Sequence, residues 1–155
     1  MAHIHEKIDF TASVYVVEGD RVLLHKHKKL GIWLPPGGHV ELDEDPNQAA
    51  IKEVREETGL DITLVGNNHM AKTWSDGSRD LITPKFINRH YFDSTHTHEH
   101  IDSVYFGRVS GGALRPEVEG AEVKWFSKSE IEDGTLNLKE AVLFYALAAL
   151  KELAE

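Results

Sequence analysis

Apolar and polar positions divide the first part of the chain into two strands and a rigid loop. Residues 10–17 and 22–27 are rich in Val, Leu and Tyr, with the polar turn "EGDR" between them, so this stretch predicts a β-hairpin. The following "GIWLPPGGHVEL" is rich in Pro and Gly, which permits only short extended pieces. Gly37 and Gly38 can adopt backbone angles closed to other residues, and we expect a loop of close approach there.

The strongest helix signal follows this loop. Asp45 suits the N-cap position, Pro46 the first turn, and Gln48 the capping-box position. Gly59 follows Thr58 and favours the end of a helix. We therefore expect a helix whose two ends are both marked by the sequence.

The rest of the chain predicts four more strands and a final helix. The strand segments are "DITLVG", "LITPKFINRHYF", "HIDSVYFGRV" and "AEVKWFS", and they bracket the first helix without regular alternation, which favours a mixed sheet over a doubly wound one. Residues 138–153 have the Ala and Leu content of a helix, with apolar positions over more than one stripe. We expect this helix to be buried on two sides, with the second side under a loop or against another subunit in a homodimer.

Length, charge and the absence of cysteine limit the classes of function. A chain of 155 residues, 41% of them hydrophobic, fits a single domain over residues 1–155. The net charge of -9 argues against nucleic-acid polymers and acidic membranes as partners. No cysteine is present, which excludes thiolate metal sites and thiol nucleophiles. The start of the chain lacks signal-peptide features and no apolar run is long enough to span a membrane, so we expect a cytoplasmic protein.

The stretch "KEVREETGL" crowds three acids, Glu53, Glu56 and Glu57, on the predicted helix. Residues three and four apart share a helix face, so the acids form one cluster while Ile51 and Val54 are expected to point toward the core. Two carboxylates about 4 Å apart in a partly buried site repel by about 4 kcal/mol at an effective dielectric constant of 20. A bound divalent cation would reverse the sign of that interaction.

Two explanations compete for this acidic cluster. The ordinary one is a solvated helix face, in which neighbouring Lys and Arg side chains balance the acids. The context favours a cation site instead, because the helix follows a glycine-rich turn and a further acid, Glu44. Carboxylate and backbone carbonyl oxygens are the ligands that Mg²⁺ and Mn²⁺ prefer.

Residues 38–60, "GHVELDEDPNQAAIKEVREETGL", resemble the signature of the Nudix hydrolases. The signature is a Gly, five residues, a Glu, seven residues, and then Arg-Glu-aliphatic-any-Glu-Glu-any-Gly-aliphatic. The positions that match it are Gly38, Glu44, Glu53, Val54, Glu56, Glu57, Gly59 and Leu60. Lys52 replaces the Arg of the signature, which keeps the charge but loses the planar fork that can bind two oxygens. We expect this exchange to weaken the activity without abolishing it.

The resemblance implies an α/β/α sandwich around a mixed β-sheet. It also implies metal-dependent hydrolysis of a pyrophosphate bond in a nucleoside di- or triphosphate derivative, such as an NTP, a nucleotide sugar like ADP-ribose, or a dinucleotide. Glu53, Glu56, Glu57 and the backbone carbonyl of Gly37 would hold one to three Mg²⁺ or Mn²⁺ ions, which orient the diphosphate and activate a water. We take Glu56 as the general base, with Glu53 and Lys52 as further catalytic residues.

Further residues are candidates for ligand or substrate contacts. Gly38 and Glu44 are expected beside the substrate, and His39 could contact it or form a hydrogen bond within its loop. Some Nudix relatives take another acid from a downstream loop, and the offset of Glu119 from Trp125 makes Glu119 resemble that metal ligand best. The alternative for Glu119 is an ordinary acidic surface loop.

The stretch "THTHEH" places His96, His98 and His100 on one side of any extended segment. A transition metal could bind there, in a structural role, but a solvated edge strand or loop is the explanation we favour. Residues 66–100 form a long connection, in which we expect part of the substrate choice to be made.

A non-catalytic module that senses nucleotides or binds proteins is the alternative function. Relatives of that kind usually lose acids from the helix, and this chain retains them. Isomerisation of an isoprenoid diphosphate would require a catalytic cysteine, which is absent.

Overall fold

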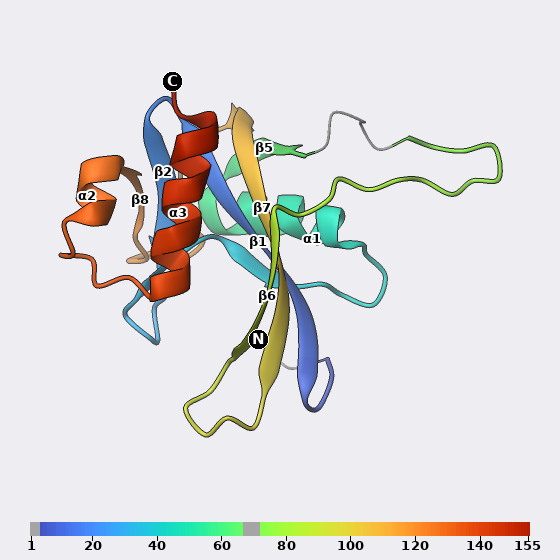
Figure 1. Ribbon diagram of the computed structural model, residues 1–155, viewed down its shortest axis with the longest axis horizontal. Coiled ribbons are helices and arrows are strands. Elements are labelled where there is room, and N and C mark those ends of the chain that lie inside the picture. Colours follow the sequence, from blue (N-terminus) through green and yellow to red (C-terminus); the bar gives the residue numbers. More distant parts are fainter. Residues whose placement is uncertain (1–3, 67–71) are drawn as a thin grey trace.

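The computed structural model describes residues 4–66 and 72–155, which form a single mixed sheet with helices on both sides (Figure 1). The strands are β1 (Ile8–Glu18), β2 (Arg21–Lys26), β3 (Trp33–Leu34), β4 (Gly37–His39), β5 (Leu60–Val65), β6 (Phe86–Tyr91), β7 (Glu99–Gly112) and β8 (Val123–Ser127). The helices are α1 (Pro46–Thr58), α2 (Lys128–Glu132) and α3 (Glu140–Leu153).

The two long strands, β1 and β7, run parallel at the centre of the sheet, and the other pairings in the described residues are antiparallel. The main strand order is β3-β2-β1-β7-β5, with β4 on β1, β6 on β7 and β8 on β2. In Figure 1, α3 lies in front of the sheet and α1 behind it. The predicted α/β/α sandwich around a mixed sheet is therefore confirmed.

Alternation along β1 builds two hydrophobic clusters, one on each face of the sheet. Val14 and Val16 pack on the α1 side with Val54, whereas Tyr15 and Val17 pack on the α3 side. A helix with one wide apolar stripe covers each face. The sheet thereby holds α1 against the short strand β4. This strand contains Gly37 and Gly38, where the sequence predicted a close approach between backbone and neighbouring atoms.

The ends of α1 follow from local chemistry, as predicted. The Asp45 carboxylate accepts the backbone N–H of Gln48 at 2.8 Å, and the Asp45 N–H donates to Gln48 Oε1 at 2.9 Å. Gly59 ends the helix in the left-handed conformation, at φ 78°. The predicted β1–β2 hairpin and the later strands are also present, with bounds shifted by a few residues.

Two sequence expectations about this region are wrong. Ile51 is 40% exposed, because the buried stripe of α1 passes through Ala50, Glu53 and Val54. Gly37 and Gly38 do not have positive φ angles. They are required because neighbouring atoms lie too close for a Cβ.

The predicted final helix is α3, and its apolar surface is covered on more than one side. Val142, Ala146 and Leu150 are buried against the sheet, and Tyr145 packs at its flank against Phe86. Phe144 is 57% exposed. The short helix α2 was not anticipated. Within the described residues, every helix is too short or too polar to cross a membrane.

The long connection of residues 66–100 contains residues 67–71, which lie outside the described residues. Its described part includes an extended loop that projects to the right in Figure 1. Arg79 in this loop contacts the Asp45 carboxylate at 3.0 Å. The loop is thus held to the start of α1, close in sequence to Glu44.

Candidate active site

Glu53 is buried where α1 crosses β4. Its side chain belongs to the buried stripe of the helix, with a relative exposure of 6%. A Cβ added to Gly38 would lie 2.5 Å from the Glu53 carboxyl carbon. Only glycine at this position leaves room for the acid, so the glycine loop and the acidic helix form one unit.

Glu57 lies one turn further along α1 and is held by two other elements. The backbone N–H of Gly37 donates to Glu57 Oε1 at 3.0 Å. His25 on β2 places its Nε2 3.0 Å from Glu57 Oε2. Burial, followed by the charge of His27, lowers the pKa of His25 to about 4, so the ring is neutral at pH 7. The contact is therefore a hydrogen bond with a neutral imidazole and not a salt bridge.

The crowded acids bind protons tightly in the absence of metal. Burial, the charge of Glu53 and the charge of Glu117 raise the pKa of Glu57 to about 9. Burial and the charge of Glu56 raise the pKa of Glu53 to about 7, against the opposing effect of Lys52. The expected repulsion between the acids is therefore present. Without a cation, Glu53 and Glu57 share a proton in a hydrogen bond. A bound cation would stabilise both groups as carboxylates.

Glu56 and Lys52 lie on the more open side of α1. Glu56 is exposed, and its charge acts on both Glu53 and Lys52. Lys52 Nζ donates to Glu44 Oε1 at 2.9 Å. Burial opposes the charge of Lys52, but this bond and the charges of Glu44, Glu53 and Glu56 raise its pKa overall. Lysine therefore supplies the positive charge expected of the signature Arg and makes one hydrogen bond to Glu44.

The downstream loop brings an acid to the cluster. The charge of Glu117 contributes to the raised pKa values of both Glu53 and Glu57. Glu119, selected from its spacing to Trp125, is exposed in the same loop. Glu117 is therefore a second candidate ligand in this loop, and Glu119 remains a prediction.

Sequence reasoning did not single out His25, although a signal was available. In β2, Leu23 belongs to the hydrophobic cluster under α1, and His25 follows two positions later on the same face. A polar residue that continues an inward-facing row indicates a partner on the covering helix. Here that partner is Glu57.

His39 faces away from the acids. It is buried, with an exposure of 5%, and its Nε2 lies 3.3 Å from Asp9 Oδ2. This placement favours the second role considered from the sequence, a polar contact within the fold. Of the three histidines in "THTHEH", His98 and His100 join Asp9 in one group, whereas His96 stacks on Tyr91 with a ring distance of 4.1 Å.

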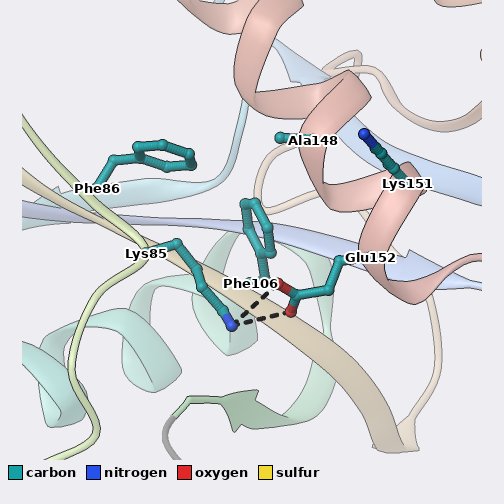
Figure 2. A pocket seen from close by; sticks show the side chains of 6 residues that line it. All are labelled: Lys85, Phe86, Phe106, Ala148, Lys151 and Glu152. Carbon is teal, nitrogen blue, oxygen red and sulfur yellow. Dashed lines mark hydrogen bonds and ion pairs between the residues drawn. The ribbon is translucent and has the colours of Figure 1, made fainter.

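A cavity of about 510 Å³ lies elsewhere, between α3 and strands β6 and β7 (Figure 2). Phe86 and Phe106 form its floor, and Lys85 contacts Glu152 across it at 2.9 Å. None of the acids of α1 lines this cavity. The acidic cluster and this cavity are therefore separate features of the molecule.

The donor set of this site fits Mg²⁺ or Mn²⁺. It consists of carboxylate oxygens on one helix, with the backbone of Gly37 beside them, and hard divalent cations prefer such oxygen ligands. The raised pKa values of Glu53 and Glu57 show that ionising both acids is unfavourable without a cation.

Comparison with known proteins agrees with this geometry. Residues 8–147 match the NUDIX domain. A NUDIX family hydrolase from Clostridium perfringens resembles the fold with a TM-score of 0.80 at 36% identity, covering 93% of this chain and 97% of that one. A Bacillus subtilis (strain 168) protein, described as a candidate 8-oxo-dGTP diphosphatase, is 27% identical over 126 residues, 79% of this chain and 70% of that protein. The m7GpppN-mRNA hydrolase NUDT17 of Xenopus laevis is 36% identical over 76 residues, 46% of this chain and 25% of that protein.

The domain match spans most of the chain, and the Clostridium perfringens structure shares both fold and sequence with it. The acids of α1 and Gly38 of β4 occupy signature positions within the matched range. The chain belongs to the Nudix family, and it is a Nudix hydrolase.

Proposed function

We propose that this hydrolase cleaves a pyrophosphate bond in a nucleoside di- or triphosphate derivative, with Mg²⁺ or Mn²⁺ as cofactor. The observation that carries the proposal is the pair of inward-facing acids on α1, with Glu53 buried, the Glu57 side chain only 11% exposed, and Glu56 exposed beside them. Buried carboxyls with raised pKa values are costly to ionise, and a divalent cation supplied with an anionic substrate offsets that cost. An acidic protein can bind an acidic substrate in this way.

The proposed ligands are the carboxylates of Glu53, Glu56 and Glu57, the backbone carbonyl of Gly37, and an acid of the downstream loop, Glu119 or Glu117. A cation bound there would supply charge neutralisation for the diphosphate and acidify a bound water. The chain's own contacts prepare the ligands, because His25 and the Gly37 N–H hold Glu57 in one orientation.

Glu56 is the proposed general base, since it is exposed beside the buried pair and can accept a proton from water. The water oxygen bonds to phosphorus, the bond from phosphorus to the bridging oxygen breaks, and the proton goes to Glu56. Lys52 and Glu44 act as an ion pair that keeps positive charge next to the acids. Gly38 leaves room for the Glu53 carboxylate, because any side chain there would meet it, and is proposed to lie beside the substrate.

The substrate class is a small nucleotide, and its identity is left open by the relatives. Their names point to an oxidised dNTP in one case and to an mRNA cap in another. The candidates for this chain are those that the family resemblance implies: NTPs, nucleotide sugars such as ADP-ribose, and dinucleotides. The intact acids give no support to a non-catalytic sensing module.

An activity screen tests this function. Release of phosphate or pyrophosphate is measured with Mg²⁺ and with Mn²⁺ across NTPs, nucleotide sugars and dinucleotides. Glu56→Gln is expected to reduce turnover by about 10²-fold or more, the usual contribution of a general base. Glu132→Gln, an exposed acid of α2, is the matched control and should leave turnover unchanged. Equal turnover by Glu56→Gln would remove Glu56 from the mechanism.

A cytoplasmic location, a single domain over residues 1–155 and a homodimer belong to the same proposal. The exposed Phe144 on α3 supports a subunit contact at that helix. Light scattering of Phe144→Ser and of the natural chain tests it, since a dimer through α3 should dissociate in the variant. Two equal masses would place any contact elsewhere.

A further inference from the structure

A second group of metal-ligating side chains lies at the start of β1, on the face of the sheet opposite α1. Asp9 and Tyr15 are separated by an even number of positions in β1, so both side chains lie on the α3 side of the sheet. In the parallel pairing of β1 with β7, Asp9 lies opposite His100. His98 precedes His100 by two residues, so both histidines lie on the same side of the sheet as Asp9. Figure 1 shows that these ends of β1 and β7 extend beyond α3.

The spacing of the ligand atoms suits a small four-coordinate metal. One ligand atom from each of Asp9, His98 and His100 lies within 4.8 Å of the others. Asp9 Oδ2 is 3.2 Å from His98 Nε2. Zinc bonds of about 2.0–2.1 Å in tetrahedral geometry place neighbouring ligand atoms about 3.3 Å apart. The Asp9–His98 separation of 3.2 Å is close to that edge.

The contacts of His98 orient its ring as in a metal-bound histidine, with Nε2 directed at the Asp9 carboxylate. Its Nδ1 lies 3.1 Å from the backbone carbonyl oxygen of Glu6. A carbonyl can only accept, so Nδ1 carries the hydrogen, and in a neutral ring Nε2 presents a lone pair toward the Asp9 carboxylate. Two acceptors at that distance repel unless a cation lies between them or the ring is protonated. Metal-bound histidines typically donate their other N–H to a carbonyl in this way.

His100 adds an independent observation. Its Nε2 is buried and has no hydrogen-bond partner within residues 4–66 and 72–155. The ring is enclosed by other rings, with centroid distances of 4.9 Å to Phe92, 5.4 Å to His98 and 5.5 Å to His90. A buried polar atom without a partner destabilises the folded state, and coordination to a metal would remove that cost.

We propose that Asp9, His98 and His100 form a structural zinc site that joins the start of β1 to the start of β7. Two imidazoles and one carboxylate suit zinc better than magnesium, which prefers oxygen ligands alone. His39 Nε2 lies 3.3 Å from Asp9 Oδ2, beside the three proposed ligands. The site uses none of the α1 acids.

Zinc titration of the full chain, after treatment with a chelator, tests the site. Calorimetry should detect one equivalent of bound zinc, and mass spectrometry should count one zinc atom per chain. His98→Gln and His100→Gln should each weaken binding at least about tenfold, the lower range for disturbing a metal's surroundings. His96→Gln is the matched control, because His96 lies in the same segment but stacks on Tyr91, and it should retain the zinc.

A combined Glu53→Gln, Glu57→Gln variant separates this site from the active site. It should lose Mg²⁺-dependent turnover and keep one tightly bound zinc. Loss of zinc in this variant, or equal loss in His96→Gln, would overturn the proposal.

Two further measurements on the natural chain remain informative if the histidine variants fail to fold. Cobalt in place of zinc should give the intense visible absorption of a tetrahedral site. Saturating zinc should also raise the melting temperature, since a metal that binds only the folded state stabilises it. No zinc uptake, or only the weak absorption of octahedral cobalt, would show that the cluster is a network of polar contacts without a metal and would contradict the assignment.

Discussion

Replacing Glu57 with Gln isolates the cost of the buried acid. The amide oxygen of Gln can still accept the Gly37 N–H. Its NH₂ can donate to the neutral His25 ring, whose other nitrogen donates to the backbone carbonyl of Pro35. The variant therefore keeps the packing and both contacts while it removes the ionisable group.

The magnitude follows from the pKa of Glu57, which is about 9 in the folded chain against an ordinary value of 4.5. Between these values the folded chain holds a proton that the unfolded chain has released, so the free energy of unfolding falls as the pH rises. Each pH unit costs about 1.4 kcal/mol. Because Glu53 shares the proton, we expect Glu57→Gln to be more stable than the natural chain by about 2–5 kcal/mol at pH 8 and nearly equal to it at pH 4.5.

Urea denaturation in the presence of a chelator, at pH 4.5 and pH 8, measures both differences. Saturating Mg²⁺ at pH 8 should then stabilise the natural chain and leave Glu57→Gln nearly unchanged, since metal binding releases the protons that the acids hold. A variant that is less stable than the natural chain at pH 8 without metal would refute the reasoning. So would a stability difference that does not change with pH.

Three further changes test the surroundings of the acids. Lys52→Arg should maintain or raise turnover, and a large drop in kcat would mean that the site is built around lysine. Gly38→Ala should lower turnover sharply and destabilise the fold by about 1–3 kcal/mol, because the new Cβ would meet the Glu53 carboxyl; thermal unfolding and the activity assay measure both effects. Glu117→Gln should weaken Mn²⁺ binding more than Glu119→Gln if the nearer charge is the ligand, and the reverse order in calorimetry would favour the residue chosen by spacing.

The ends of α1 and the grouping of the acids on that helix could be predicted from sequence because both depend on near neighbours. Asp45, Gln48 and Gly59 define the helix through contacts within a few residues. The burial of Glu53 could not be predicted, because it depends on how α1 meets β4. Periodicity alone placed the acids on a face away from the core, and the close approach of Gly38 instead turns Glu53 inward.

The group around Asp9 shows the same limit more strongly. Its contact with His98 joins residues 89 positions apart, through the parallel pairing of β1 and β7. The spacing of "THTHEH" made a metal site one possibility, but it could not indicate that Asp9 joins the group or that His96 lies outside it. Strand register decided both, and no local pattern in the sequence encodes that register.

We propose that the acids of α1 bind a divalent cation. Mn²⁺ titration followed by electron paramagnetic resonance tests it most directly, in a His98→Gln background so that the second cluster does not contribute. We predict that Mn²⁺ binds with an affinity that rises with pH, and that replacing Glu53, Glu56 and Glu57 together by Gln abolishes binding. Unchanged Mn²⁺ binding in that triple variant would contradict the account.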